Sequence, residues 1–164
     1  MTDLILPLDD VLSSVDSELL GWEEATAHID EVAMAVTLHW RTSPSTRIHW
    51  NSDAWNEGLV QGGPGEADPS PKVTITDVSE RWRDLSGKRL TACTFSHSTR
   101  PSDLPWAMNL QFASGANLVI ALGELLDGQP SYMPDTLLVI GTREAAESYS
   151  HPAALGTAWG DRRE

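Results

Sequence analysis

PWAMNLQFASGANLVIALGE, residues 105–124, is the most strongly patterned stretch of this chain. Large apolar residues alternate with smaller or polar ones up to Phe112, and a second alternation follows Gly115. Period-two alternation on both sides of a glycine predicts a β-hairpin. A three-residue loop over residues 114–116, with Gly115 at positive φ, keeps the apolar residues on one face. The register that follows pairs Phe112 with Leu118, Leu110 with Ile120 and Met108 with Leu122.

Composition indicates one soluble domain. A chain of 164 residues suits a single domain over residues 1–164. Its one cysteine, Cys93, cannot form an internal disulfide and excludes a multi-cysteine zinc or iron-sulfur site. The N-terminus has no basic segment, and no apolar run approaches the length of a membrane span. We therefore expect a cytoplasmic protein that does not insert into membranes.

The charge is strongly acidic and unevenly distributed. The formal net charge is −13, and no Lys or Arg occurs between Met1 and Trp40. The acidic residues of this segment are Asp3, Asp9, Asp10, Asp16, Glu18, Glu23, Glu24, Asp30 and Glu31. They would repel nucleic-acid phosphates and anionic lipid, and would attract a basic protein. The alternative is that the acidic surface serves solubility alone.

Patterns elsewhere predict the remaining elements. Apolar residues at helical spacing predict an amphipathic N-terminal helix over Leu8–Leu20, ended by Gly21. Further elements are expected as strands over residues 32–40, 46–50, 73–75, 88–95 and 137–140, a short helix over 142–149 capped by Thr142, a surface loop over 61–71 and an irregular tail over 150–164. The imperfect alternation of strand 88–95 indicates a bulge or cover on both faces. The predicted fold class is α+β: a mainly antiparallel meander of about six or seven strands, as half-barrel or sandwich, with the N-terminal helix and one or two short helices.

No catalytic or metal site is predicted. One even register of the strands expected over residues 32–40 and 46–50 pairs Leu38 with Trp50 and sets His39 opposite His49. Two histidines are fewer than the three protein ligands of a catalytic zinc site, so no metal or other cofactor is expected. Ser96-His97-Ser98 lacks the geometry of a nucleophile and its base, and Cys93 is expected to be a small buried hydrophobe.

A tryptophan between acidic residues is the strongest candidate for partner binding. Trp55 lies in a predicted loop between Asp53 and Glu57, where an aromatic side chain flanked by acids is typical of an interface anchor. Glu23 and Glu24 extend the predicted acidic surface. These five residues form the predicted partner-binding site.

The segment WRDLSGKRL, residues 82–90, followed by the central hairpin, resembles sequences of small acidic bacterial proteins of unknown function. These include immunity proteins that are paired with polymorphic toxins. The resemblance covers about residues 80–124, and it implies a binding role, because an immunity protein occludes a toxin and catalyses no reaction. The sequence thus predicts a non-enzymatic protein-binding module, such as an immunity or inhibitor protein.

Two alternatives stay open at this point. The protein could be an enzyme or small-ligand binder in which Trp40, Trp50 and Trp106 line the mouth of a half-barrel. It could also be a structural homodimeric adaptor joined through an edge strand.

Overall fold

The computed structural model describes residues 15, 19–27, 33–44, 46–53, 56–61, 73–77, 85, 87–99, 104–133, 136–152 and 156–161. The first strands are β1 (Leu19–Ala27), β2 (Ala33–Trp40), β3 (Thr46–Asp53), β4 (Asn56–Gln61) and β5 (Val73–Asp77). They are followed by β6 (Leu90–Ser96), β7 (Ala107–Phe112), β8 (Asn117–Leu122), β9 (Glu124–Leu126), β10 (Gln129–Ser131) and β11 (Leu137–Ile140). A short helix, α2 (Arg143–Ser148), precedes β12 (Gly156–Thr157) and β13 (Gly160–Asp161).

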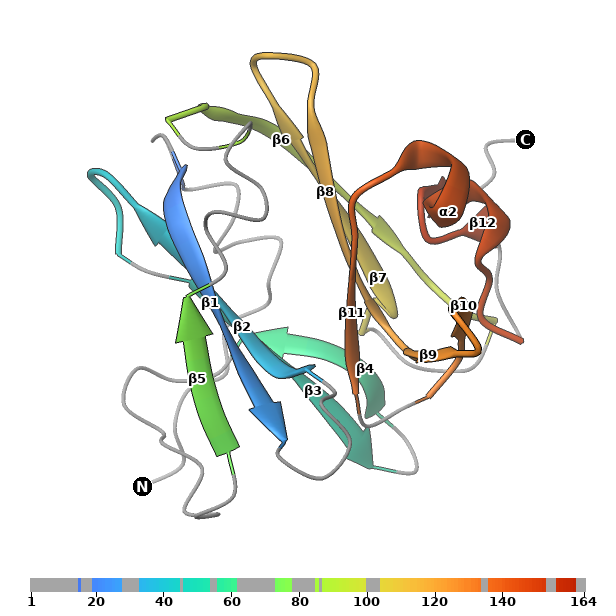
Figure 1. The fold of residues 1–164 in the computed structure, drawn as a ribbon. Coiled ribbons are helices and arrows are strands. Elements are labelled where there is room, and N and C mark those ends of the chain that lie inside the picture. The colour runs from blue at the N-terminus through green and yellow to red at the C-terminus, as the bar shows by residue number, and fades with distance from the viewer. Residues whose placement is uncertain are drawn as a thin grey trace.

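The strands form a nine-stranded antiparallel sheet and two small two-stranded sheets (Figure 1). The order in the large sheet is β4-β3-β2-β11-β8-β7-β6, with β1 added beside β2 and β5 beside β1. Its end strands, β4 and β6, do not pair with each other, so the described strands do not close into a barrel. The prediction of a mainly antiparallel β protein is confirmed. The large sheet has more strands than the sequence indicated, and β9–β10 and β12–β13 are separate hairpins.

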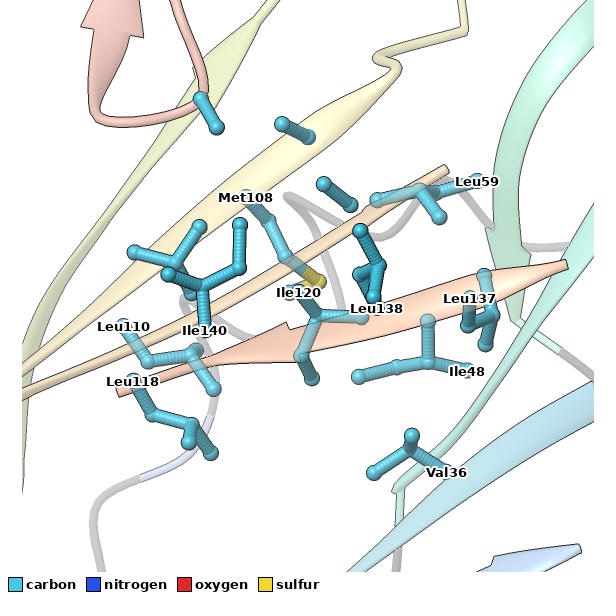
Figure 2. Close-up of a cluster of buried hydrophobic side chains, with 14 of the residues drawn as sticks. Val36, Ile48, Leu59, Met108, Leu110, Leu118, Ile120, Leu137, Leu138 and Ile140 are labelled. Atoms are coloured by element: carbon cyan, nitrogen blue, oxygen red, sulfur yellow. The ribbon is translucent and has the colours of Figure 1, made fainter. Parts of the chain in front are cut away.

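Strand β2 is the junction of the large sheet. One edge of β2 pairs with β1, whereas the other pairs with β11 at Ala33 and with β3 from Val36 onward. The strands therefore fall into two groups, β1 to β5 and β6 to β8 with β11, and both contribute to one core. Figure 2 shows the shared cluster, with Val36, Ile48 and Leu59 from the first group and Met108, Leu110, Leu118, Ile120 and Leu137 from the second.

The central hairpin is β7–β8, as the alternation predicts, but its register differs from the expected one by two residues. The observed partners are Leu110 with Leu118 and Met108 with Ile120. The Phe112 N–H donates to the Ala116 carbonyl at 3.0 Å, so the loop is Ala113–Gly115. Gly115 has φ 88°. A three-residue hairpin loop places its left-handed residue last, and Gly115 therefore fixes the loop one residue earlier than predicted.

Both faces of this hairpin are covered. The residues of β7 from Ala107 to Leu110 and those of β8 from Leu118 to Leu122 are all buried. Strand β11 is likewise largely buried, as its continuous apolar run predicts. In β6 the register shifts between Leu90 and Ala92, which confirms the predicted bulge. The bulge lets Leu90, Cys93 and Phe95 share the face of their partners Phe112, Leu110 and Met108.

The N-terminal prediction is wrong where the structure describes it. Val15 is outside any helix, Leu19 and Leu20 begin β1, and Gly21 lies within that strand rather than ending a helix. Strand β1 pairs with β2 on one side and β5 on the other, and these ladders outweigh a helical spacing of apolar residues. The other residues of the predicted helix lie outside the described residues.

Two segments expected to be irregular have different outcomes. In the predicted tail, residues 156–161 contain the β12–β13 hairpin, and the turn residue Ala158 is fully buried. Its N–H donates to the Tyr149 carbonyl at 2.8 Å. Of the predicted loop 61–71, Gln61 ends β4 and the rest lies outside the described residues.

The predicted helix near the C-terminus is α2, and the Thr142 hydroxyl caps it by accepting from the Ala145 N–H at 3.2 Å.

The expected pairing of His39 with His49 does not form. Leu38 pairs with Thr46 instead of Trp50, so the observed register differs from the expected one by four residues. The β2–β3 ladder ends at this pair. Beyond that point Trp40 pairs with β1, and its indole N–H donates across the turn to the Thr46 hydroxyl at 3.0 Å. The partners of the two histidines are Gly21 for His39 and Val60 for His49.

Tyr149 gives the fold a measurable pH dependence. Its buried hydroxyl donates to the Leu122 carbonyl, and burial raises its pKa above the ordinary value of 10.0. Above pH 10 an unfolded tyrosine ionises while the folded one keeps its proton, so the unfolded state binds fewer protons. We expect Tyr149 to lower the free energy of unfolding by about 1.4 kcal/mol per pH unit there. In urea titrations from pH 8 to 11, the free energy of unfolding should fall less steeply with pH for Tyr149→Phe than for the wild type. Equal slopes for the two proteins would contradict the raised pKa of Tyr149.

Candidate functional site

The β9–β10 hairpin is the part of the described fold that is least absorbed into the core. It pairs only within itself, with Leu126 opposite Gln129 and Leu125 opposite Pro130. Its two-residue turn is Asp127-Gly128, with φ 52° and 78°. Two consecutive positive φ angles define a type I′ turn, which matches the twist of the flanking strands and favours Asp-Gly. The hairpin lies at the edge of the molecule, below α2 and β12 in Figure 1.

This hairpin exposes two adjacent leucines. Leu125 is 60% exposed and Leu126 is 54% exposed, and among the side chains whose burial the structure describes no other large apolar one is exposed. A single exposed leucine is common on protein surfaces, but two at consecutive positions of one short hairpin are less usual. We call Leu125 and Leu126 the leucine pair. Since neighbouring residues of a strand point to opposite faces, the pair presents apolar surface on both faces of the hairpin.

The residues that flank the leucine pair in the sequence are acidic. Glu124 precedes the leucines and Asp127, which is exposed, follows them. The sequence has no Lys or Arg between Pro101 and Thr142. An apolar centre with a charged rim is the usual composition of a protein interface. The rim here is negative.

The base of the hairpin is held rigidly. The Gly123 N–H donates to the Thr136 carbonyl at 3.0 Å, and the Thr136 hydroxyl donates back to the Gly123 carbonyl at 2.7 Å. Behind this contact, Trp106 packs edge-on against Tyr149 with ring centroids 5.5 Å apart. Tyr132, just beyond β10, packs edge-on against the buried His151 at 4.1 Å. The hairpin is therefore fixed relative to the core, so little ordering is required when a partner binds.

A second feature is a hollow of about 280 Å³ beside the start of α2. Three connections form it: the β7–β8 turn, the link from β11 into α2, and the β12–β13 turn. Its lining residues are Gly115, Asn117, Val119, Ile140, Gly141, Thr142, Arg143 and Trp159. None of them belongs to the β9–β10 hairpin.

A buried amide organises one wall of this hollow. Asn109 in β7 is 1% exposed, and its Nδ2 donates to the Trp159 carbonyl at 3.2 Å. Its Oδ1 accepts from Asn117 Nδ2 at 2.8 Å. The Trp159 N–H donates to the Thr157 hydroxyl at 3.3 Å. Because an unpaired amide would be costly in the core, these bonds fix the positions of Asn117 and Trp159 together.

Of the five predicted partner-binding residues, the four that the structure describes lie on strands. Asp53 ends β3 and pairs with Asn56, while Glu57 in β4 pairs with Ser52. Trp55 lies outside the described residues, as do the side chains of Asp53 and Glu57. Pairing of β3 with β4 extends to the ends of both strands, which is why the predicted loop is shorter.

The other two predicted residues, Glu23 and Glu24, lie in β1 between β2 and β5. Their side chains are outside the described part. The backbone places them in a different strand of the large sheet from Asp53 and Glu57. All four residues belong to the large sheet, whereas the leucine pair belongs to the separate β9–β10 sheet.

The three tryptophans of the alternative prediction, Trp40, Trp50 and Trp106, are all packed on or within the core. Trp40 is 5% exposed and Trp106 is 2% exposed, and both belong to the core cluster. The Trp106 indole N–H donates to the His97 carbonyl at 3.3 Å, which satisfies it inside the protein. Trp50 is half-buried against the same core. Among the described residues, no group of three or more His, Cys, Asp or Glu side chains is arranged to bind a metal ion.

Sequence reasoning missed the leucine pair, although a signal was present. Asp127-Gly128 between short apolar and polar runs is a strong hairpin signal. No residue that lines the hollow is among the predicted site residues. Arg143 and Asn117 line the hollow, and only tertiary contacts bring them there.

Comparisons with known protein families, with curated proteins and with solved structures found no significant match. In the part of the chain that the structure describes, no helix has the length and apolar character needed to cross a bilayer.

Proposed function

We propose that this protein is a non-enzymatic protein-binding module whose partner is basic, and that it acts as an immunity or inhibitor protein. The observation that supports this proposal most is the leucine pair on a rigid hairpin at the molecular edge. The acidic rim and the net charge of −13 support the sign of the partner's charge. The immunity function that the sequence resemblance implies remains a prediction.

The physical argument separates two contributions. Inserting the hairpin into a cleft of the partner, with one leucine against each wall, supplies affinity, at about 1.5 to 3 kcal/mol for each fully buried leucine. The negative rim supplies attraction at long range and favours a basic surface over an acidic one. In this proposal the hairpin replaces Trp55 as the principal anchor. The acidic residues Asp53, Glu57, Glu23 and Glu24 then act through long-range charge.

Capture of the partner tests the proposal. We expect the wild-type protein to retain a basic protein from the lysate of its source, and the double variant Leu125→Ser/Leu126→Ser to lose it. Serine removes the apolar surface without changing charge. Gln129→Ser is the matched control, since Gln129 is exposed on the same hairpin. Retention of the same partner by the double variant would contradict the proposal.

Two further outcomes would favour the alternatives. A wild-type dimer in light scattering that the double variant converts to monomer would indicate a homodimeric adaptor. A metabolite that raises the melting temperature by several degrees, with no protein captured, would indicate a ligand-binding protein.

Salt provides a separate test of the partner's charge. Exposed charges are screened beyond a Debye length of about 8 Å at physiological ionic strength. We therefore expect the association rate constant to fall steeply between low and high salt, while the dissociation rate constant changes little. Stopped-flow or surface-based kinetics at several salt concentrations would measure this. A salt-independent association rate would show that the partner is not selected by charge.

A further inference from the structure

We propose that the hollow between the β7–β8 turn, the start of α2 and Trp159 binds a small carboxylate with a compact apolar body. This inference goes beyond the protein-binding function, because the hollow shares no residue with the leucine pair. The two proposals can therefore fail separately.

Hydrogen-bond donors dominate the polar part of the hollow. The Arg143 guanidinium carbon lies 5.1 Å from the centre of the Trp159 ring, and both residues line the hollow. Asn117 uses one of its two amide hydrogens for Asn109, and its other hydrogen forms no bond with a described residue. The Thr142 hydroxyl adds a further donor. A surface rich in donors, one of them cationic, matches an anionic ligand with acceptor oxygens.

Arg143 is available to an incoming anion. Its side chain is 67% exposed, and only its Nε is bonded to Glu147, at 2.8 Å. The outer nitrogens of the guanidinium can form a bidentate contact with a carboxylate. The existing pair with Glu147 is exposed, and such pairs contribute little free energy, so a ligand can compete with it. Stacking on Trp159 holds the guanidinium at the rim.

The rest of the hollow is apolar. Val119 is 1% exposed and Ile140 is 6% exposed, and they contribute their side chains from β8 and β11. Apolar residues on one side and donors on the other suit a ligand that has a hydrocarbon part and one charged end. At about 280 Å³ the hollow suits a small molecule rather than a folded partner.

The polar wall is preformed. Asn109, buried within β7, positions Asn117 and Trp159 by two bonds from a single side chain. Fixing donors before the ligand arrives reduces the entropy lost on binding. An ordinary surface depression has no requirement for a buried amide that holds two of its lining residues.

An NMR titration with phenylacetate tests the inference, with the neutral phenylacetamide as its counterpart. We expect phenylacetate to shift the indole N–H signal of Trp159, assigned by its loss in Trp159→Phe, and the amide signal of Asn117. Arg143→Gln should weaken phenylacetate binding about tenfold, which is the effect of losing one charged hydrogen-bond partner. Arg41→Gln is the matched control, because Arg41 is exposed, does not line the hollow and carries the same charge.

Several results would overturn the inference. They are the absence of a Trp159 shift up to the solubility limit of phenylacetate, equal binding of phenylacetamide, and equal affinities of Arg143→Gln and Arg41→Gln. The variant Leu125→Ser/Leu126→Ser should bind phenylacetate like the wild type. That comparison distinguishes failure of the hollow from failure of the protein-binding proposal.

Discussion

Replacing Leu110 by Asp is expected to abolish folding. Leu110 is fully buried in β7 between Cys93 of β6 and Leu118 of β8. The substitution removes a core leucine and puts a carboxyl group where no described residue offers it a charged partner. A buried unpaired charge and a lost core side chain together cost on the order of 5 kcal/mol or more, which is comparable with the whole stability of a typical domain.

Leu125→Asp is the matched control for this experiment, because it makes the same chemical change at a leucine that is 60% exposed. We expect its free energy of unfolding, obtained from the urea titration, to change by less than about 0.5 kcal/mol. Far-UV circular dichroism and urea titration measure both variants. A folded Leu110→Asp protein with the wild-type midpoint would show that the central hairpin is not the core.

The second large effect is expected from Gly123→Ala at the base of the β9–β10 hairpin. Gly123 has φ 155°, and an added Cβ would lie 2.5 Å from the Tyr149 hydroxyl and 2.9 Å from the Ser131 carbonyl oxygen. Contacts this short require the backbone or Tyr149 to move, and Tyr149 is held by its bond to the Leu122 carbonyl. We expect a loss of about 3 kcal/mol, at the upper end of overpacking effects.

Gly128→Ala is the comparison that isolates this steric effect. Gly128 also has positive φ, 78°, but an added Cβ there meets nothing within 4 Å. Its expected cost is only that of a left-handed alanine, about 1 to 2 kcal/mol. Thermal or urea unfolding should therefore rank Gly123→Ala well below Gly128→Ala in stability. The reverse order would contradict the packing at the hairpin base.

Local patterns in the sequence were sufficient to predict the central hairpin. Alternation defines which residues face the core, and this parity is the same in the predicted and observed registers. A slip by two residues preserves parity, so alternation alone does not distinguish the two registers. The deciding feature is the left-handed Gly115, which must end the three-residue loop.

Other elements depend on contacts between distant segments. The predicted helical spacing of apolar residues extends to Leu20, but Leu19 and Leu20 begin β1, which is held by pairing with β2 and β5. Strands β12 and β13 have two residues each, which is too short for any periodicity to show. Their position is fixed by side-chain bonds from the sheet, such as that from the Ser96 hydroxyl to the Thr157 carbonyl at 2.8 Å.

The candidate site was less predictable than the fold. Asp127-Gly128 indicates a turn, but the exposure of Leu125 and Leu126 depends on whether the rest of the fold covers them. The hollow could not be predicted from local patterns, because Asn117 begins β8, Arg143 begins α2 and Trp159 lies in the β12–β13 turn. A buried Asn109 in an apolar strand was the sequence signal that polar contacts lie on the second face of β7.

The dissociation rate of the captured partner tests the central claim most directly. In Leu125→Ala/Leu126→Ala, the apolar anchor is truncated while the charge of the acidic rim is unchanged. If the leucine pair is the anchor, dissociation should be at least about 30-fold faster than for the wild type, which corresponds to about 2 kcal/mol, with an unchanged association rate. A dissociation rate equal to that of the wild type, measured with the same partner, would show that the interface lies elsewhere on the protein.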